Sequence, residues 1–206
     1  MIDHQDENEQ IAERRRKLAE LREQSDPYPN DFRPNALAGE VHQRWGGESD
    51  EALSASQVRV KLAGRMMSQR VMGKASFAHI QDMTGQIQLR LERDRLQDGV
   101  YQEFKKWDLG DILGAEGVLF KTKTGELTVQ VETIRLLTKA LRPMPEKYHG
   151  LVDQEARYRQ RYLDLLVNED TRQTFRLRSQ IIDSLRAFLS ARGFVEVETP
   201  MMQPIP

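Results

Sequence analysis

Apolar and polar positions alternate most regularly between residues 74 and 92, where two segments face each other across a turn at 82–85. A period of two is typical of β-strands that bury one face. The face predicted to join a core carries Ala78, Ile80, Ile87, Leu89 and Leu91.

The other face of this strand pair is polar and carries one aromatic side chain. Its residues are Phe77, His79, Gln81, Gln88 and Arg90. Packing explains a Phe among amide and cationic side chains poorly, whereas a flat ligand that stacks on the ring explains it well. A register shifted by one residue would bury Phe77 and turn Ala78 and Ile80 outward, so the pattern alone leaves that alternative open.

The segments around this pair predict a five-stranded barrel. The expected elements are a strand over 58–67 with a bulge at Gly64, a loop over 68–74, the strand pair itself, a helix over 98–107, a strand over 112–120, a turn over 121–126 and a strand from Leu127. Three strands, a helix and two strands, in this order, are typical of an OB-fold. Its strand 2 and 3 face and its 1-2 and 4-5 loops bind oligonucleotides.

A helix and a connector are predicted before the barrel. An apolar stripe of Ile11, Leu18 and Leu21 over residues 9–24 indicates a helix that lies on a neighbouring domain. Residues 25–55 contain three prolines and no sustained period, so they are expected to be a connector with one short helical turn.

After the barrel, Pro143 and Pro145 indicate a stiff linker. Helices are then expected over 157–166 and from Asp170, the second with an apolar face and an end at Gly193, followed by a strand from Phe194. One strand and these helices cannot bury their own apolar faces, so this second domain is predicted to be incomplete. The predicted fold class is mainly β with α, divided into a helix and connector (1–56), an OB-fold (57–138), a linker (139–152) and an incomplete domain (153–206).

The charged residues are distributed unevenly along the chain. The 206 residues carry a net charge of −1, yet residues 57–93 hold seven Lys and Arg against two Asp and Glu. A local positive patch suits a polyanionic partner, because the attraction to phosphate is screened beyond about 10 Å at physiological salt. The chain has no cysteine and four scattered His, so we predict neither disulfides nor a metal site. No signal peptide and no run of about 18 apolar residues is found, so we expect a cytoplasmic protein that does not enter a membrane.

Several sequence motifs make the prediction more specific. RYRQRYLDL at 157–165 and GFVEVETPMM at 193–202, together with the N-terminal helix and the OB pattern, resemble the N-terminal portion of the bacterial-type class II lysyl-tRNA synthetases. GKASF at 73–77, FKKWDLGD at 104–111 and TKTGEL at 122–127 favour the lysine enzymes over their aspartate and asparagine relatives. The segment up to Pro200 resembles the first class II motif, a helix and a strand that build the dimer interface in that family.

The resemblance implies that the barrel binds the anticodon of tRNA(Lys), UUU or CUU. In the family an aromatic stacks on the central uridine and a glutamine recognises it, and these positions fall on Phe77 and Gln88. A basic residue of the 1-2 loop falls on Arg70 and an acid of the 4-5 loop on Glu126. A Gln amide matches the O4 acceptor and the N3–H donor of uracil, and a carboxylate accepts from a base N–H. By sequence alone, Gln88 and Glu126 are also compatible with ordinary surface roles, and His79 has no assigned role.

The remaining expectations concern partners and chemistry. Candidate phosphate contacts are Arg15, Arg22, Arg65, Lys74, Lys121 and Lys123, and the candidate dimer contacts are Phe194 and Pro200. The resemblance implies homodimerisation and the use of ATP and Mg²⁺ by the full-length ligase, but the motifs that hold them do not occur before Pro206. We therefore assign no catalytic residue, expect no activity from these 206 residues alone, and expect no binding to DNA. Two alternatives stay open: a stand-alone OB module for tRNA or other single strands, and a structural role in assembly.

Overall fold

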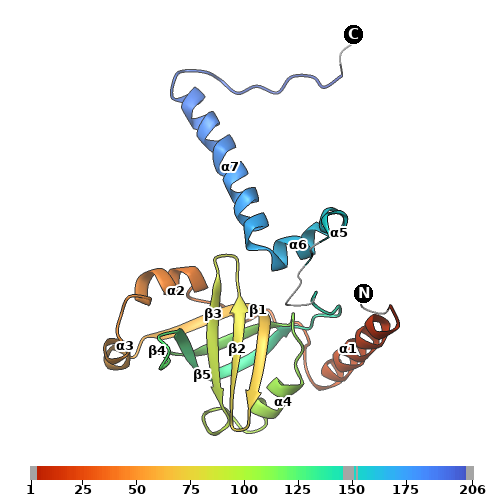
Figure 1. Cartoon of the computed structure of the whole chain (residues 1–206), viewed down its shortest axis with the longest axis vertical. Helices are drawn as coiled ribbons and strands as arrows, with labels where there is room; N and C mark the ends of the chain where they lie inside the picture. The colour runs from red at the N-terminus through yellow and green to blue at the C-terminus, as the bar shows by residue number, and fades with distance from the viewer. Residues whose placement is uncertain (1–3, 146–150, 152, 203–206) are drawn as a thin grey trace. The chain divides into compact units, whose positions relative to one another are not determined.

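Five strands close into a barrel in the order β1-β2-β3-β5-β4 (Figure 1). The computed structural model describes residues 4–145, 151 and 153–202. Only the β3–β5 pair is parallel among the described strand pairs. The strands are β1 (Arg59–Met72), β2 (Ala75–Gln81), β3 (Gln86–Glu92), β4 (Ile112–Lys121) and β5 (Leu127–Thr138). The predicted OB-fold is thus confirmed.

The buried face predicted from the alternation is confirmed as well. Its five side chains are at most 2% exposed, and they pack with buried residues of the other strands in one hydrophobic core. Phe77, His79, Gln88 and Arg90 lie on the opposite face, so the shifted register is excluded.

β1 is longer than predicted, and its irregularity lies elsewhere. It continues to Met72, so only Gly73 and Lys74 separate it from β2, and Arg70 is part of a strand and not of the 1-2 loop. The register shift lies between Met66 and Ser68, not at Gly64. The extra residue exchanges the two faces: Met66 is opposite buried Ile80, whereas Ser68 is opposite His79.

Gly64 instead allows the backbones of β1 and β2 to approach each other closely. A Cβ at this position would lie 2.9 Å from the carbonyl oxygen of Gln81. The end of β2 can therefore cross closely over β1 only because no side chain stands between them.

In the described part of the first unit, four α-helices and one 3-10 turn accompany the barrel. They are α1 (His4–Gln24), α2 (Ala38–Trp45), α3 (Asp50–Ser56), the turn η1 (Arg93–Arg95) and α4 (Val100–Lys106). The prediction of one helical turn in the connector was wrong, because α2 and α3 both form there. Val41 and Leu53 anchor them in the core, and such short helices carry too few apolar side chains to show a helical period.

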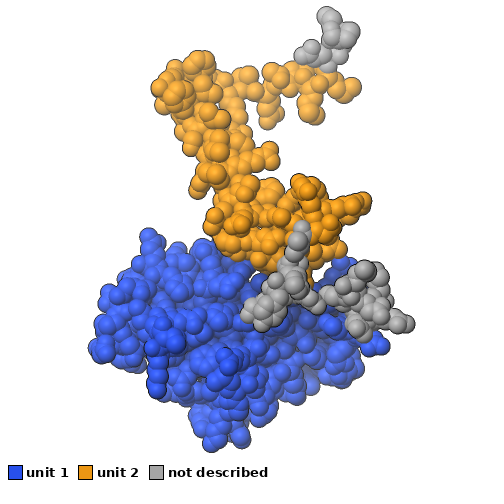
Figure 2. Space-filling model, viewed as in Figure 1, with its two compact units in different colours: residues 1–144 blue, residues 145–206 orange. Residues whose placement is uncertain are grey.

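The chain divides into two units, residues 1–144 and 145–206, shown in different colours in Figure 2. In the second unit the single helix predicted over 157–166 is two helices that break at Gln160, α5 (Gln154–Arg159) and α6 (Arg161–Val167). The long helix α7 (Glu169–Ser190) is confirmed, although its N-cap is Asn168 and not Asp170. The strand predicted from Phe194 was wrong: described residues 191–202 contain no strand, since an extended segment without a neighbour has no ladder to join.

Asp164 holds the three helices of the second unit together. Its buried carboxylate accepts hydrogen bonds from Arg157 Nε at 2.9 Å, Asn168 Nδ2 at 2.6 Å and Thr171 Oγ1 at 3.1 Å. Burial raises the pKa of Asp164, but these donors outweigh it and hold the pKa below its ordinary value.

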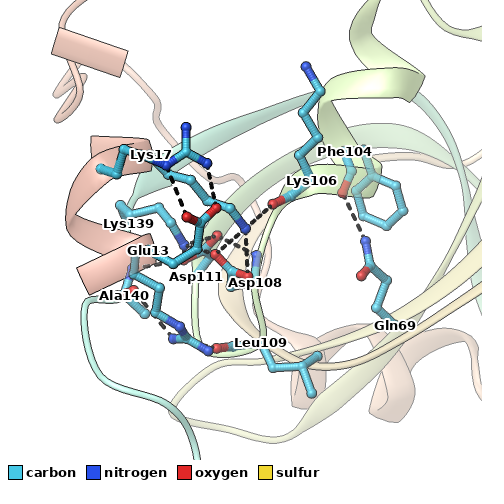
Figure 3. Close-up of polar contacts among 12 residues, drawn as sticks. Glu13, Lys17, Gln69, Phe104, Lys106, Asp108, Leu109, Asp111, Lys139 and Ala140 are labelled. Carbon is cyan, nitrogen blue, oxygen red and sulfur yellow. Dashed lines mark hydrogen bonds and ion pairs between the residues drawn. The ribbon is translucent and has the colours of Figure 1, made fainter. Parts of the chain in front are cut away.

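A buried ion cluster fixes α1 and the end of β5 to the loop before β4 (Figure 3). Lys139 Nζ lies 2.7 Å from Asp111 Oδ1 and 2.6 Å from Asp108 Oδ2, and both Lys139 and Asp111 are almost inaccessible. Lys17 of α1 lies 2.9 Å from Asp108. Arg14, also from α1, donates to the carbonyls of Leu109, Ala140 and Arg142.

None of the described helices is long and apolar enough to pass through a bilayer.

We predict that Lys139→Met destabilises the barrel by about 3 kcal/mol or more, because it leaves the buried Asp111 carboxylate without its counter-charge. The midpoint of urea unfolding measures this loss. Lys106→Met is the matched control: that ammonium is exposed and pairs with Glu103, so its removal should cost less than about 1 kcal/mol. Equal losses of unfolding free energy in the two variants would contradict the role of Lys139 as the counter-charge of the buried Asp111 carboxylate.

The same cluster predicts a dependence of stability on pH. Burial raises the pKa of Asp108, but the hydrogen bonds and charges of Lys139 and Lys17 outweigh it, so the pKa lies below the ordinary 3.8. A lowered folded pKa contributes stability that is present above pH 3.8 and is lost as the pH falls through the folded value. Between pH 5 and pH 3 the free energy of unfolding should therefore fall less steeply in Asp108→Asn than in the unchanged chain, as urea titrations at each pH would show.

Candidate nucleic-acid interface

Two rows of paired residues cross the polar face of the barrel. Residues directly opposite each other in neighbouring strands point to the same side of a sheet. The first row runs through Arg70, Phe77, Arg90 and Gln130 of β1, β2, β3 and β5. The second row runs through Ser68, His79, Gln88 and Thr128 of the same strands. The bulge in β1 is what brings Ser68 and Arg70 onto this face.

A continuous chain of hydrogen bonds links the second row. His79 Nδ1 lies 2.8 Å from Ser68 Oγ, and His79 Nε2 lies 2.9 Å from Glu126 Oε1. Gln88 Nε2 donates to Glu126 Oε2 at 2.7 Å, and Thr128 Oγ1 donates to Gln88 Oε1 at 2.8 Å. Glu126 lies just before β5 and reaches across β3, so it joins side chains of β2 and β3. We call Ser68, His79, Gln88, Glu126 and Thr128 the polar relay.

The turn before β5 positions Glu126. Thr122 Oγ1 accepts from the Glu126 backbone N–H at 3.1 Å, and Gly125 adopts a φ of 82°, which favours glycine. The side chains of His79 and Glu126 are 32% and 44% exposed, so a ligand on this face can reach both.

Phe77 lies half-buried in the first row, opposite Arg90 on one side and Arg70 on the other. The Arg90 guanidinium lies 5.6 Å from the centroid of the Phe120 ring and pairs with Glu92. The Phe77 ring is therefore placed beside the polar relay, with cationic side chains in both neighbouring strands.

The candidate phosphate contacts fall into two groups. Arg65 donates to the carbonyl of Gly110 at 2.7 Å and Lys121 to that of Gly46 at 2.8 Å, so protein contacts fix both cations. The other cations, with Arg70, are exposed, and their side chains form no hydrogen bond or ion pair with any residue that the structure describes; these are Arg15, Arg22, Arg70, Lys74 and Lys123.

The sequence-predicted residues are thus only partly brought together. Gln88 and Glu126 are in contact, and Phe77 and Arg70 form a cross-strand pair. Arg15 and Arg22 lie on α1, which contacts the barrel at the loop before β4. Phe194 and Pro200 lie in the second unit, where both are exposed.

Sequence reasoning missed the role of Ser68, His79 and Thr128. For His79 a signal was present, since the alternation already places it on the face of Gln88. For Ser68 none was, because a continued alternation from Met66 would have placed it on the buried face.

No group of three or more His, Asp or Glu side chains that could hold a metal ion occurs in the described ranges.

Two families match the sequence in separate parts. Residues 60–137 match the OB-fold nucleic acid binding domain, and residues 153–206 match the class II tRNA synthetases for D, K and N. The first match covers the barrel that carries both rows.

Curated relatives match almost the whole chain. Proteins named lysine–tRNA ligase from Coxiella burnetii (strain Dugway 5J108-111), Thioalkalivibrio sulfidiphilus and Idiomarina loihiensis are 61%, 59% and 63% identical to it. Each alignment covers 98% of this chain and 40% of the relative. The chain therefore spans about two fifths of the length of these relatives.

Proposed function

We propose that this chain, which carries the OB-fold and the beginning of the class II synthetase domain of the lysine–tRNA ligases, recognises the anticodon of tRNA(Lys) through Arg70, Phe77, Gln88 and Glu126 on the polar face of its barrel. The observation that carries the proposal is the contact between Gln88 and Glu126 beside Phe77. Gln88 comes from β3, Glu126 from the turn before β5 and Phe77 from β2, yet all three lie on the same face of the barrel.

Each side chain supplies a different part of the recognition. Phe77 offers an aromatic face to the central base, and such stacking contributes about 1–3 kcal/mol with little dependence on sequence. Gln88 supplies a donor and an acceptor for the edge of uracil. Arg70 and Lys74 are free to neutralise phosphate, and each such contact steepens the salt dependence of binding.

The relatives favour a part of a ligase over a stand-alone binding module. Their identity of about 60% extends beyond the barrel through the second unit. There α7 exposes a row of apolar side chains that suits burial against another protein surface: Phe175, Leu177, Ile181, Ile182, Leu185, Phe188 and Leu189.

We further propose that the whole ligase is a cytoplasmic homodimer, with α7, Phe194 and Pro200 at the dimer contact. It joins lysine to tRNA with ATP and Mg²⁺. In this proposal the side chains that hold ATP, Mg²⁺ and lysine belong to the part of the ligase that this chain, which spans 40% of its relatives, does not cover.

We predict that Phe77→Ala weakens binding of an anticodon stem-loop with UUU by about 1–3 kcal/mol, because the base loses its stacking surface. Phe77→Tyr should retain most of the affinity and Phe77→Leu should not, since only the first keeps an aromatic face. Fluorescence anisotropy with a labelled stem-loop measures the dissociation constants. If Leu serves as well as Tyr, the ring supports the fold and not a base.

Gln88→Ala is expected to reduce the preference for UUU over a loop with a changed central base. The variant lacks the amide donor and acceptor that would form hydrogen bonds with the edge of uracil. Gln86→Ala is the matched control, since Gln86 lies two residues earlier on β3 and its amide donates to Gln81 at 2.7 Å and not to the polar relay. The two dissociation constants are measured for each variant at one salt concentration. Equal weakening of both loops by Gln88→Ala would show that this residue does not recognise the central base.

A further inference from the structure

A glutamine amide alone does not distinguish uracil from cytosine. Uracil presents an acceptor at O4 and a donor at N3, whereas cytosine presents a donor at N4 and an acceptor at N3. An amide meets the first pattern with its NH₂ group toward position 4 and the second pattern after a rotation of 180°. Specificity therefore requires that the orientation of the amide be fixed.

The contacts of Gln88 fix the orientation of its amide. Glu126 Oε2 lies 2.7 Å from Gln88 Nε2, and a carboxylate only accepts hydrogen bonds, so the amide must turn its NH₂ group toward Glu126. The opposite orientation would place the Gln88 Oε1 acceptor against the Glu126 Oε2 acceptor, which is unfavourable. Thr128 completes the arrangement, because its buried hydroxyl donates to Oε1 at 2.8 Å. One N–H and one lone pair of the amide remain for a base.

The Glu126 carboxylate needs an anchor of its own, since it belongs to a turn and is 44% exposed. His79 supplies it: Nε2 lies 2.9 Å from Glu126 Oε1, while Nδ1 lies 2.8 Å from Ser68 Oγ. The imidazole is thus held at both nitrogens and presents one N–H to the carboxylate. Figure 1 shows that the strands β1, β2 and β3, which carry Ser68, His79 and Gln88, lie side by side.

We propose that His79, with Ser68 behind it and Thr128 beside Gln88, is a positioning residue that selects uracil over cytosine at the central anticodon base. It acts through Glu126, which keeps Gln88 in the orientation that matches uracil. The inference rests on the proposed recognition of the anticodon by Gln88. It assigns His79 a role in discrimination and not in affinity, because removing the anchor releases the amide without removing it.

The test compares stem-loops that carry UUU and UCU, bound to the full 206-residue chain and to His79→Phe, which keeps a ring but removes both nitrogens. The unchanged chain should prefer UUU by roughly tenfold or more. In His79→Phe that preference should fall at least about fivefold, while the dissociation constant for UUU changes less than about threefold. The matched control is His42→Phe, because His42 is an imidazole of the same unit that is exposed and whose Nε2 lies 3.0 Å from the carbonyl oxygen of Gln86, outside the polar relay.

A second variant tests whether the effect passes through the carboxylate. Glu126→Gln replaces a pure acceptor with an amide that can face either way, so it should also lower the preference. The double variant His79→Phe/Glu126→Gln should then lose no more than Glu126→Gln alone, because both changes act on one network. Fully additive losses would overturn the relay as the route.

The outcomes separate the two proposals. A preference for UUU that persists in His79→Phe, with an unchanged thermal midpoint, would overturn the role of His79 and leave the proposed function standing. A loss of binding to both loops in equal measure would show a structural role and overturn the inference as well. An unchanged chain that binds UUU and UCU equally would instead overturn recognition of the central base itself.

Discussion

The antiparallel pairing of β2 with β3 is the constraint on which the rest of this structure depends. Because side chains alternate with a period of two, a shift of one residue would exchange the core face and the polar face completely. Buried Ala78 and Leu89 pair directly and resist such a shift. The same register sets His79 opposite Gln88. The hydrophobic core thus determines which polar side chains are neighbours on the opposite face.

The bulge in β1 extends this arrangement to a further strand, and the buried ion cluster supports it. Asp111 and Gly110 hold Met66, the residue just before the bulge, since the Met66 N–H donates to the carbonyl of Asp111 and the Gly110 N–H donates to that of Met66, both at 2.8 Å. Asp111 is also the carboxylate that Lys139 neutralises. Burying this pair is unfavourable unless its geometry is well satisfied, so the cluster specifies the local backbone more than it stabilises the fold. The bulge that follows Met66 in turn places Ser68 on the polar face, opposite His79.

Much of this architecture could be predicted from the sequence, because alternation and strand order are local signals that the core enforces. The faces of β2 and β3 and the OB order follow from them, and motif resemblance led to Phe77 and Gln88. The bulge could not be predicted, since an inserted residue changes the alternation of the strand without changing its composition. The contact between His79 and Glu126 could not be predicted either. The two residues lie 47 positions apart, and only the closed barrel brings them together.

The polar relay contributes little to the stability of the fold, so its proposed role lies in recognition. The two side chains of its His79–Glu126 contact are 32% and 44% exposed, and exposed pairs of this kind contribute only about 0–1 kcal/mol to folding. Stability therefore does not require a histidine at position 79. Discrimination between two bases, however, is a difference between two affinities, and it depends on the unfavourable alternative as much as on the favourable one. In the proposed recognition, a carboxylate held beside Gln88 makes the cytosine-matching orientation of the amide unfavourable, and this effect acts on the wrong ligand while leaving the fold almost unchanged.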